Sequence, residues 1–402
     1  MKFSKRLSLM QQSPIRKLAS FATTAKSEGI NVYHLNIGQP DIITPKVFFD
    51  TVKSFDKDIL EYADSRGICE LIDAIIKYYN LYNIDFTKED IIITNGGSEA
   101  LLFSFMATCD SGDNILVPEP FYTNYNSFTQ CLNININSVT TVAENGFHLP
   151  HKEEILSKID DRTSAILIVN PGNPTGCVYT KEEVKMIADI AIEKDLWIIA
   201  DEVYREFIYD DIEYTSFGHI KEVEDRVVII DSISKKYSAC GARIGSIACK
   251  NNELINEIMK VCQGRLCVAT IEQLGAAALY KTPKSYFQKV NNEYKKRRDT
   301  LYSELIKING IICEKPMGAF YIIVKLPVED AEDFVTWTLK YFRRNNETIM
   351  CTPAQDFYST PGLGKNEIRL AYILKEKDLK RCGQLLKEAL EEYSQLKNIN
   401  IF

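Results

Sequence analysis

The 402-residue sequence has no apolar run long enough to cross a membrane. A helix that spans a bilayer needs about 20 consecutive apolar residues, and the apolar runs here have the length of single strands. Residues 1–10 carry positive charge but lack the apolar core of a signal peptide. We therefore expect a cytoplasmic protein that has no membrane partner.

Histidine is scarce, with four residues in the chain, and the eleven cysteines include no Cys-x-x-Cys pair. Zinc sites are typically built from closely spaced cysteines and histidines. His148 and His151 form one His-x-x-His in a loop-like stretch, where surface residues are the simpler interpretation. An odd number of scattered cysteines does not indicate a disulfide framework. We expect no metal ion and reduced thiols.

An excess of positive charge is also missing, since 48 Lys and Arg residues face 55 Asp and Glu residues and the net charge is −7. A surface that binds nucleic acid as its main function is usually basic. We therefore expect no nucleic-acid partner. The length exceeds what one hydrophobic core usually supports, and two domains are expected.

The most informative stretch runs from Asp231 to Cys249, between two strand-like apolar runs. Lys235 would lie on the connection between these buried strands. A partly desolvated amine beside a second cation has a lowered pKa and can form an imine with a carbonyl. Ser232 and Arg243 supply a hydroxyl and a guanidinium fork, which together suit a phosphate. Pyridoxal phosphate carries both an aldehyde and a phosphate, and Lys236 is the competing candidate for the aldehyde.

Polar motifs also follow two other apolar runs. Ala165–Val169 leads into an Asn-Pro-Gly-Asn-Pro-Thr-Gly segment that contains Asn173, and Trp197–Ala200 leads into Asp201. A helical pattern separates the two runs, which predicts a parallel sheet with its polar motifs at the carboxyl ends of the strands. A carboxylate at a buried strand end needs a cation partner, because burying it unpaired costs several kcal/mol.

The stretch around Lys235 resembles the cofactor-lysine signature of class I/II aminotransferases, the fold-type I pyridoxal-phosphate enzymes. The matching positions are Ser232, Ser234, Lys235, Tyr237, Gly241, Arg243 and Gly245. The resemblance extends from Gly38 to Arg369 and preserves the order of the motifs. It implies that Lys235 binds pyridoxal 5'-phosphate and acts as the catalytic base, while Ser232 and Arg243 bind the phosphate.

The resemblance also implies roles around the cofactor ring. Asp201 would pair with the protonated pyridine nitrogen and keep the ring an electron sink. Asn173 and Tyr204 would donate hydrogen bonds to the phenolate oxygen, and Asn173 would also border the substrate. Tyr122 would stack on the ring, whereas core packing is the alternative for the two neighbouring aromatic residues.

Five further residues match family positions. The amides of Gly97 and Ser98, where a strand enters a helix through a glycine turn, would bind the phosphate. Tyr62 would reach the phosphate of the other subunit, or else simply pack at a helix entry. Gly38 would let the backbone approach the substrate. Arg369 would clamp the substrate carboxylate, with an internal salt bridge as the alternative.

The expected fold is α/β with two domains. Residues 46–285 would form the large domain, in which helices cover both faces of a mostly parallel sheet that binds the cofactor. Residues 1–45, an N-terminal arm, and residues 286–402 would form a smaller α+β domain. We expect a homodimer with its active sites at the interface.

The expected activity is transfer of an amino group from an L-amino acid to a 2-oxo acid by a ping-pong mechanism. Aspartate and 2-oxoglutarate are the favoured pair, and Arg265 and Arg16 are the two candidates for a side-chain carboxylate. An aromatic or alanine-type aminotransferase is one alternative. A pyridoxal-phosphate-dependent lyase of the C–S lyase type is another.

Overall fold

Seven strands from the middle of the chain pair into one sheet. In the computed structural model, which describes residues 1–397, their order is β2-β8-β7-β6-β5-β3-β4. The strands are β2 (Ile91–Thr94), β3 (Asn114–Glu119), β4 (Asn135–Thr140), β5 (Thr163–Val169), β6 (Trp197–Asp201), β7 (Val227–Ser232) and β8 (Gly245–Ala248). Strands β3 to β7 are parallel, whereas β8 runs antiparallel to both of its neighbours. The predicted α/β fold with a mostly parallel sheet is confirmed.

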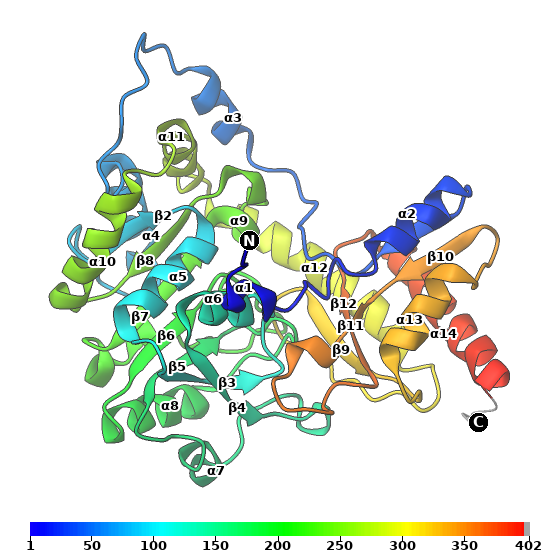
Figure 1. Ribbon diagram of the computed structural model, residues 1–402. Helices are drawn as coiled ribbons and strands as arrows, with labels where there is room; N and C mark the ends of the chain where they lie inside the picture. Colours follow the sequence, from blue (N-terminus) through cyan, green and yellow to red (C-terminus); the bar gives the residue numbers. More distant parts are fainter. Residues whose placement is uncertain (398–402) are drawn as a thin grey trace.

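Helices cover both faces of this sheet (Figure 1). In β6, Ile198 belongs to the core on one face and Ile199 to the core on the other. This alternation is expected of a strand buried on both sides. The helices of this lobe are α3 (Lys46–Lys53), α4 (Cys69–Asn80), α5 (Gly96–Thr108), α6 (Asn124–Leu132), α7 (Lys152–Leu156), α8 (Lys181–Glu193), α9 (Ile233–Lys236), α10 (Asn252–Arg265) and α11 (Thr270–Leu279). Helices α4, α8 and α11 pack on one face, and α5, α6 and α10 pack on the other.

A second lobe lies beside the first and is built from both ends of the chain (Figure 1). Its strands are β9 (Tyr321–Lys325), β11 (Thr352–Pro353) and β12 (Glu367–Ala371), which are antiparallel, and β1 (Asn31–His34) and β10 (Glu347–Met350), which are parallel. Its helices are α2 (Ala19–Ser27), α12 (Lys284–Leu305), α13 (Ala331–Lys340) and α14 (Glu376–Lys397). They share one apolar core with the strands. The exact domain boundaries stay a prediction.

Short elements complete the fold. Helix α1 (Lys5–Ser8) lies near α6 on the first lobe. The 3₁₀ turns are η1 (Ala143–Asn145), η2 (Phe217–His219), η3 (Lys221–Val223), η4 (Cys240–Ala242) and η5 (Gln355–Phe357). Within residues 1–397, every helix is too short or too polar to span a bilayer.

The parallel strands bring the predicted polar motifs to one edge. Val169 at the end of β5 is paired in register with Asp201 at the end of β6, and Asp201 is in turn paired with Ile230 near the end of β7. Three sequence-distant strands therefore end at nearly the same level. The residues that follow them can surround a single ligand.

Candidate active site

A cavity of about 380 Å³ lies at this edge of the sheet and is also lined by residues of the second lobe. Its walls include the ends of β5, β6 and β7, the start of α5, and residues of β9 and β12. The predicted site residues that line it are Gly38, Gly97, Ser98, Tyr122, Asn173, Asp201, Tyr204, Ser232, Lys235, Arg243 and Arg369. The structure thus brings eleven of the thirteen predicted site residues around one cavity.

Lys235 faces this cavity, and its neighbour does not. Lys235 follows β7 directly in α9, and its Nζ donates a hydrogen bond to the carbonyl of Gly38 at 3.0 Å. Lys236 is buried, and its Nζ pairs with Asp231 at 2.5 Å while lying over the ring of Tyr78. Of the two lysines, Lys235 is therefore the one whose amine a ligand can reach.

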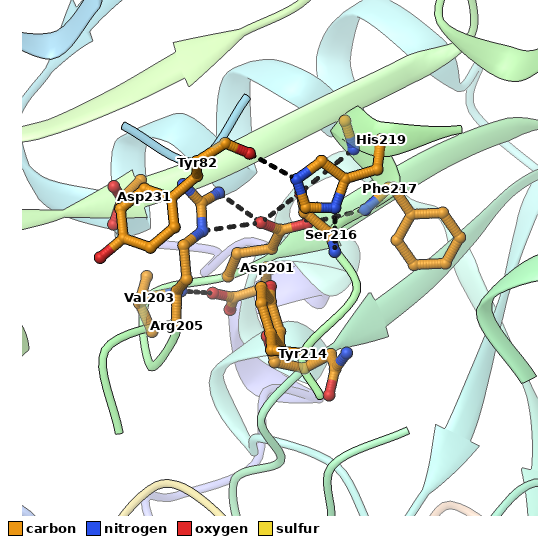
Figure 2. Close-up of polar contacts among 12 residues, drawn as sticks. Tyr82, Asp201, Val203, Arg205, Tyr214, Ser216, Phe217, His219 and Asp231 are labelled. Atoms are coloured by element: carbon orange, nitrogen blue, oxygen red, sulfur yellow. Dashed lines mark hydrogen bonds and ion pairs between the residues drawn. The ribbon is translucent and has the colours of Figure 1, made fainter. Parts of the chain in front are cut away.

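Asp201 is a buried carboxylate that has no cation partner among residues 1–397. Its side chain accepts a hydrogen bond from the Tyr125 hydroxyl at 2.8 Å. It accepts another from the Val203 amide at 3.4 Å (Figure 2). The nearby guanidinium of Arg205 is paired with Glu202 instead. Burial raises the pKa of Asp201 to about 6. A ligand that brings a positive charge to this carboxylate would remove the cost of burying it.

The start of α5 and Arg243 form a cradle for an anion. The first amides of a helix have no partner inside the helix and attract negative charge. Gly96 has a φ of +76°, and a Cβ atom built there would lie 2.3 Å from Nη2 of Arg243. The guanidinium therefore packs directly against the backbone of the glycine turn. The hydroxyl of Ser232, which lies within 2.9 Å of the Ile244 carbonyl, is another polar group of this wall.

Arg369 is a buried cation that has no acidic partner among the described residues. Its side chain is almost fully buried in β12. Nη2 donates to the carbonyl of Asn36 at 2.6 Å, Nη1 donates to Oδ1 of Asn173 at 3.1 Å, and Nε has no hydrogen-bond partner within residues 1–397. Burial lowers the pKa of the guanidinium. The internal salt bridge that the sequence left open is absent from the described residues, so the site favours an anionic ligand.

Aromatic residues complete the wall between the lobes. The hydroxyl groups of Tyr204 and Tyr321 are 3.0 Å apart. Burial raises the pKa of Tyr122, which lines the cavity, to about 12, so this phenol stays neutral. Phe121 is fully buried in the core, as its alternative interpretation required.

Sequence reasoning missed three residues of the site. Tyr125 donates to Asp201, the carbonyl of Asn36 accepts from Arg369, and Tyr321 lies under Gly38, where an added Cβ would overlap its hydroxyl. Tyr125 and Tyr321 have the same apolar neighbours as ordinary core aromatics, and Asn36 acts through its backbone. The glycine at position 38 was the one available signal of a close approach.

Two predicted residues lie away from the cavity. Tyr62 is 81% exposed, so within one chain it contacts no ligand in the cavity. Arg265 is ion-paired with Glu99 at 2.6 Å and also donates to the carbonyl of Ser65 at 2.9 Å. Within one chain Arg265 therefore does not line the cavity, and Glu99 already neutralises its charge. The assignment of Arg265 to the substrate stays a prediction. Arg16, the other candidate, lines the cavity.

Comparisons with known proteins agree with this geometry. The model of the family described as "Aminotransferase class I and II" matches residues 30–384. A probable aspartate aminotransferase of Methanocaldococcus jannaschii is 34% identical, covering 96% of this chain and 100% of the relative. A (5-formylfuran-3-yl)methyl phosphate transaminase of the same organism is 33% identical, covering 97% and 100%. The solved alanine aminotransferase from Pyrococcus furiosus has a TM-score of 0.89 and 30% identity, covering 97% of this chain and 100% of that one.

Proposed function

Because this chain belongs to the class I and II aminotransferase family and is a pyridoxal-phosphate-dependent aminotransferase, we propose roles for the residues that line its cavity. The observation that supports these roles is that two buried charges, neither of which has a partner of opposite charge among residues 1–397, line the same cavity. Asp201 is a carboxylate in need of a cation, and Arg369 is a cation in need of an anion. A pyridinium nitrogen and a substrate carboxylate would satisfy them both.

The residues present fit the cofactor. Asp201 would hold its pyridine nitrogen, while Arg243, Ser232 and the amides of Gly97 and Ser98 would hold its phosphate. The remaining contacts would come from Tyr122 on the ring face and from Asn173 and Tyr204 at the phenolate oxygen. When bound, pyridoxal phosphate supplies a ring that accepts negative charge from the substrate Cα.

The chain's own groups would then orient the substrate and move its proton. Arg369 would bind the α-carboxylate through the nitrogens that now contact Asn36 and Asn173. The amine of Lys235, held beside the carbonyl of Gly38, would take a proton from the substrate Cα. The same groups serve both halves of a ping-pong cycle, in which one 2-oxo acid leaves before another binds.

The phosphate cradle gives a first prediction. Gly96→Ala should weaken binding of pyridoxal phosphate about tenfold, because the new Cβ would displace Arg243 and a lost hydrogen bond to a charged group costs about 1.5–3 kcal/mol. Titration of the cofactor-free enzyme measures this affinity. Gly112→Ala is the matched control, since Gly112 also has a positive φ (+99°) but an added Cβ meets nothing within 4 Å. The control should lose stability and keep its affinity, and equal affinities in both variants would contradict the cradle.

Aspartate and 2-oxoglutarate are our proposed substrates. The support comes from a relative that bears the name aspartate aminotransferase and from the free cation of Arg16 in the cavity. The solved alanine aminotransferase makes alanine the second candidate donor.

We also propose a homodimer with its active sites at the interface. Four exposed hydrophobic or aromatic side chains, Ile59, Leu60, Tyr62 and Leu266, are 52–81% exposed. Thr270 donates a hydrogen bond to the carbonyl of Glu61 at 3.2 Å, so residues 59–62 lie beside the segment that follows Leu266. A contiguous exposed apolar surface is typical of an interface, and a partner would allow Tyr62 to reach a phosphate. The domain division at residues 45 and 285 and a cytoplasmic location stay predictions from the sequence.

A panel of amino donors and 2-oxo acids tests the proposed function. We expect the holoenzyme to convert aspartate with 2-oxoglutarate into oxaloacetate and glutamate, monitored by product analysis and by the absorbance of the bound cofactor. Release of ammonia or a thiol with no amino transfer would identify a lyase. Faster conversion of alanine or an aromatic donor than of aspartate would overturn the substrate assignment. The assignment as an aminotransferase would still hold.

A further inference from the structure

We propose that Arg16 binds a second anionic group on the substrate, at the end remote from the reacting carbon. This inference rests on the proposed function and assigns it a substrate class, amino donors and 2-oxo acids with a distal carboxylate or phosphate. Arg16 is then the specificity-determining residue of the site.

The charges of the cavity lead to this assignment. Its lining contains four cations, Arg16, Lys235, Arg243 and Arg369, and one carboxylate, Asp201. Lys235 and Arg243 are assigned to the aldehyde and phosphate of the cofactor, and Arg369 to the substrate α-carboxylate. Arg16 is the cation of the described lining that remains without an anion. Its charge would attract a substrate that brings one more negative group than a simple amino acid.

Asn36 joins Arg16 to the carboxylate clamp. The carbonyl of Asn36 accepts from Nη2 of Arg369 at 2.6 Å, and its side-chain Nδ2 donates to the carbonyl of Ile15 at 2.9 Å. Ile15 directly precedes Arg16. A single residue thus fixes the position of the Arg16 backbone relative to the clamp. Arg16 and Arg369 therefore line the same cavity and are linked through one residue.

The segment that carries Arg16 is anchored on both lobes. It runs from α1 on the first lobe to α2 on the second (Figure 1). On the first lobe, Gln11 accepts a hydrogen bond from Asn126 at 3.1 Å. On the second, Lys17 pairs with Glu332 and, at 2.8 Å, with Asp356. Lys17 is therefore neutralised, whereas the guanidinium of Arg16 forms no ion pair or hydrogen bond with the described residues 1–397.

Within one chain, the other elements considered for binding a distal anion lack a free positive charge. Arg265 is paired with Glu99. The first turn of α5, which also borders the cavity, has Gly97 and Ser98 and no cation. Neither element offers a free positive charge where Arg16 does.

Substitutions of Arg16 in the holoenzyme test the proposal. Arg16→Met should lower kcat/KM for aspartate about 10- to 100-fold, the effect of losing one charge-assisted contact, and leave kcat/KM for alanine within about twofold. Arg16→Lys should recover most of the loss because it keeps the charge. Lys5→Met is the matched control, since it removes an exposed cation of the same segment outside the cavity. It should change neither value.

Inhibitor titrations give a readout that does not require turnover. Succinate should shift the absorbance of the wild-type holoenzyme at lower concentration than propionate, and Arg16→Met should abolish the difference. Comparing phosphoserine with serine tests for a distal phosphate, as comparing succinate with propionate tests for a distal carboxylate.

Equal losses for aspartate and alanine, or an unchanged succinate preference in Arg16→Met, would overturn the proposal. Loss of that preference in Arg265→Met alone would move the role to Arg265. Absence of transamination with any donor would refute the proposed function, while the succinate titration would still decide the role of Arg16.

Discussion

Replacing Lys235 by alanine is expected to lower the rate of transamination by at least about a thousandfold. A positioned general base contributes about 10²–10⁴-fold, and Lys235 is also the residue proposed to bond the cofactor. Its amine lies in the cavity beside the carbonyl of Gly38, where it meets both ligands. The turnover number and the absorbance of covalently held cofactor, measured after gel filtration, should both fall.

The neighbouring lysine provides the control for this experiment. Lys236 forms a buried pair with Asp231 and does not line the cavity. Removing one partner of a buried pair costs about 3–5 kcal/mol, so Lys236→Met should lower the melting temperature and keep the covalent attachment. Lys235→Arg keeps a charge but should lose the attachment. Retention of attachment in Lys235→Ala, or its loss only in Lys236→Met, would show that the wrong lysine was chosen.

The large sheet could be predicted because its strands have a local signature. The apolar runs at 165–169, 197–200 and 227–230 correspond to β5, β6 and β7, each extended by one or two polar residues at an end. Pairing over long distances has no such signature. Strand β1 pairs with β10, from Asn31 opposite Glu347 onward, and β8 enters the sheet antiparallel between β2 and β7. These strand pairings depend on which surfaces pack against each other in the folded protein. A local sequence pattern does not contain that information.

The residues of the site also fall into two groups, those that local sequence predicts and those that depend on long-range contacts. Groups that stand beside a strand end or a glycine turn, such as Lys235, Asp201 and Gly97, could be predicted because their local context restricts where they point. Tyr125 acquires its role only by reaching Asp201, 76 residues along the chain. Arg265 is paired with Glu99, 166 residues away, and does not line the cavity. Contacts of this kind follow from tertiary packing.

Asp201→Asn is expected to lower kcat by about a hundred- to a thousandfold while leaving the fold intact. A neutral amide cannot stabilise a positive pyridine nitrogen, and losing one member of a buried charge pair costs about 3–5 kcal/mol. The amide oxygen can still accept from Tyr125, which donates to the carboxylate at 2.8 Å. Steady-state kinetics measures the loss. A kcat within about threefold of wild type would refute the role of Asp201.

The same substitution should stabilise the enzyme when the cofactor has been removed. Burial raises the pKa of Asp201 from 3.8 to about 6. A carboxyl group whose pKa is higher in the folded state destabilises the fold as pH rises from about 4 through about 6, and the full cost persists above that pH. The shift corresponds to about 3 kcal/mol.

Urea unfolding of the cofactor-free protein measures this effect. Asp201→Asn should be more stable than wild type at pH 8, and the difference should shrink toward pH 4. The exposed Asp161, changed to Asn, is the control and should show no such trend. Greater stability combined with lost activity would mean that Asp201 is kept in a costly environment for the charge it brings to the cofactor. A pH-independent difference would instead indicate that Asp201 has only a packing role.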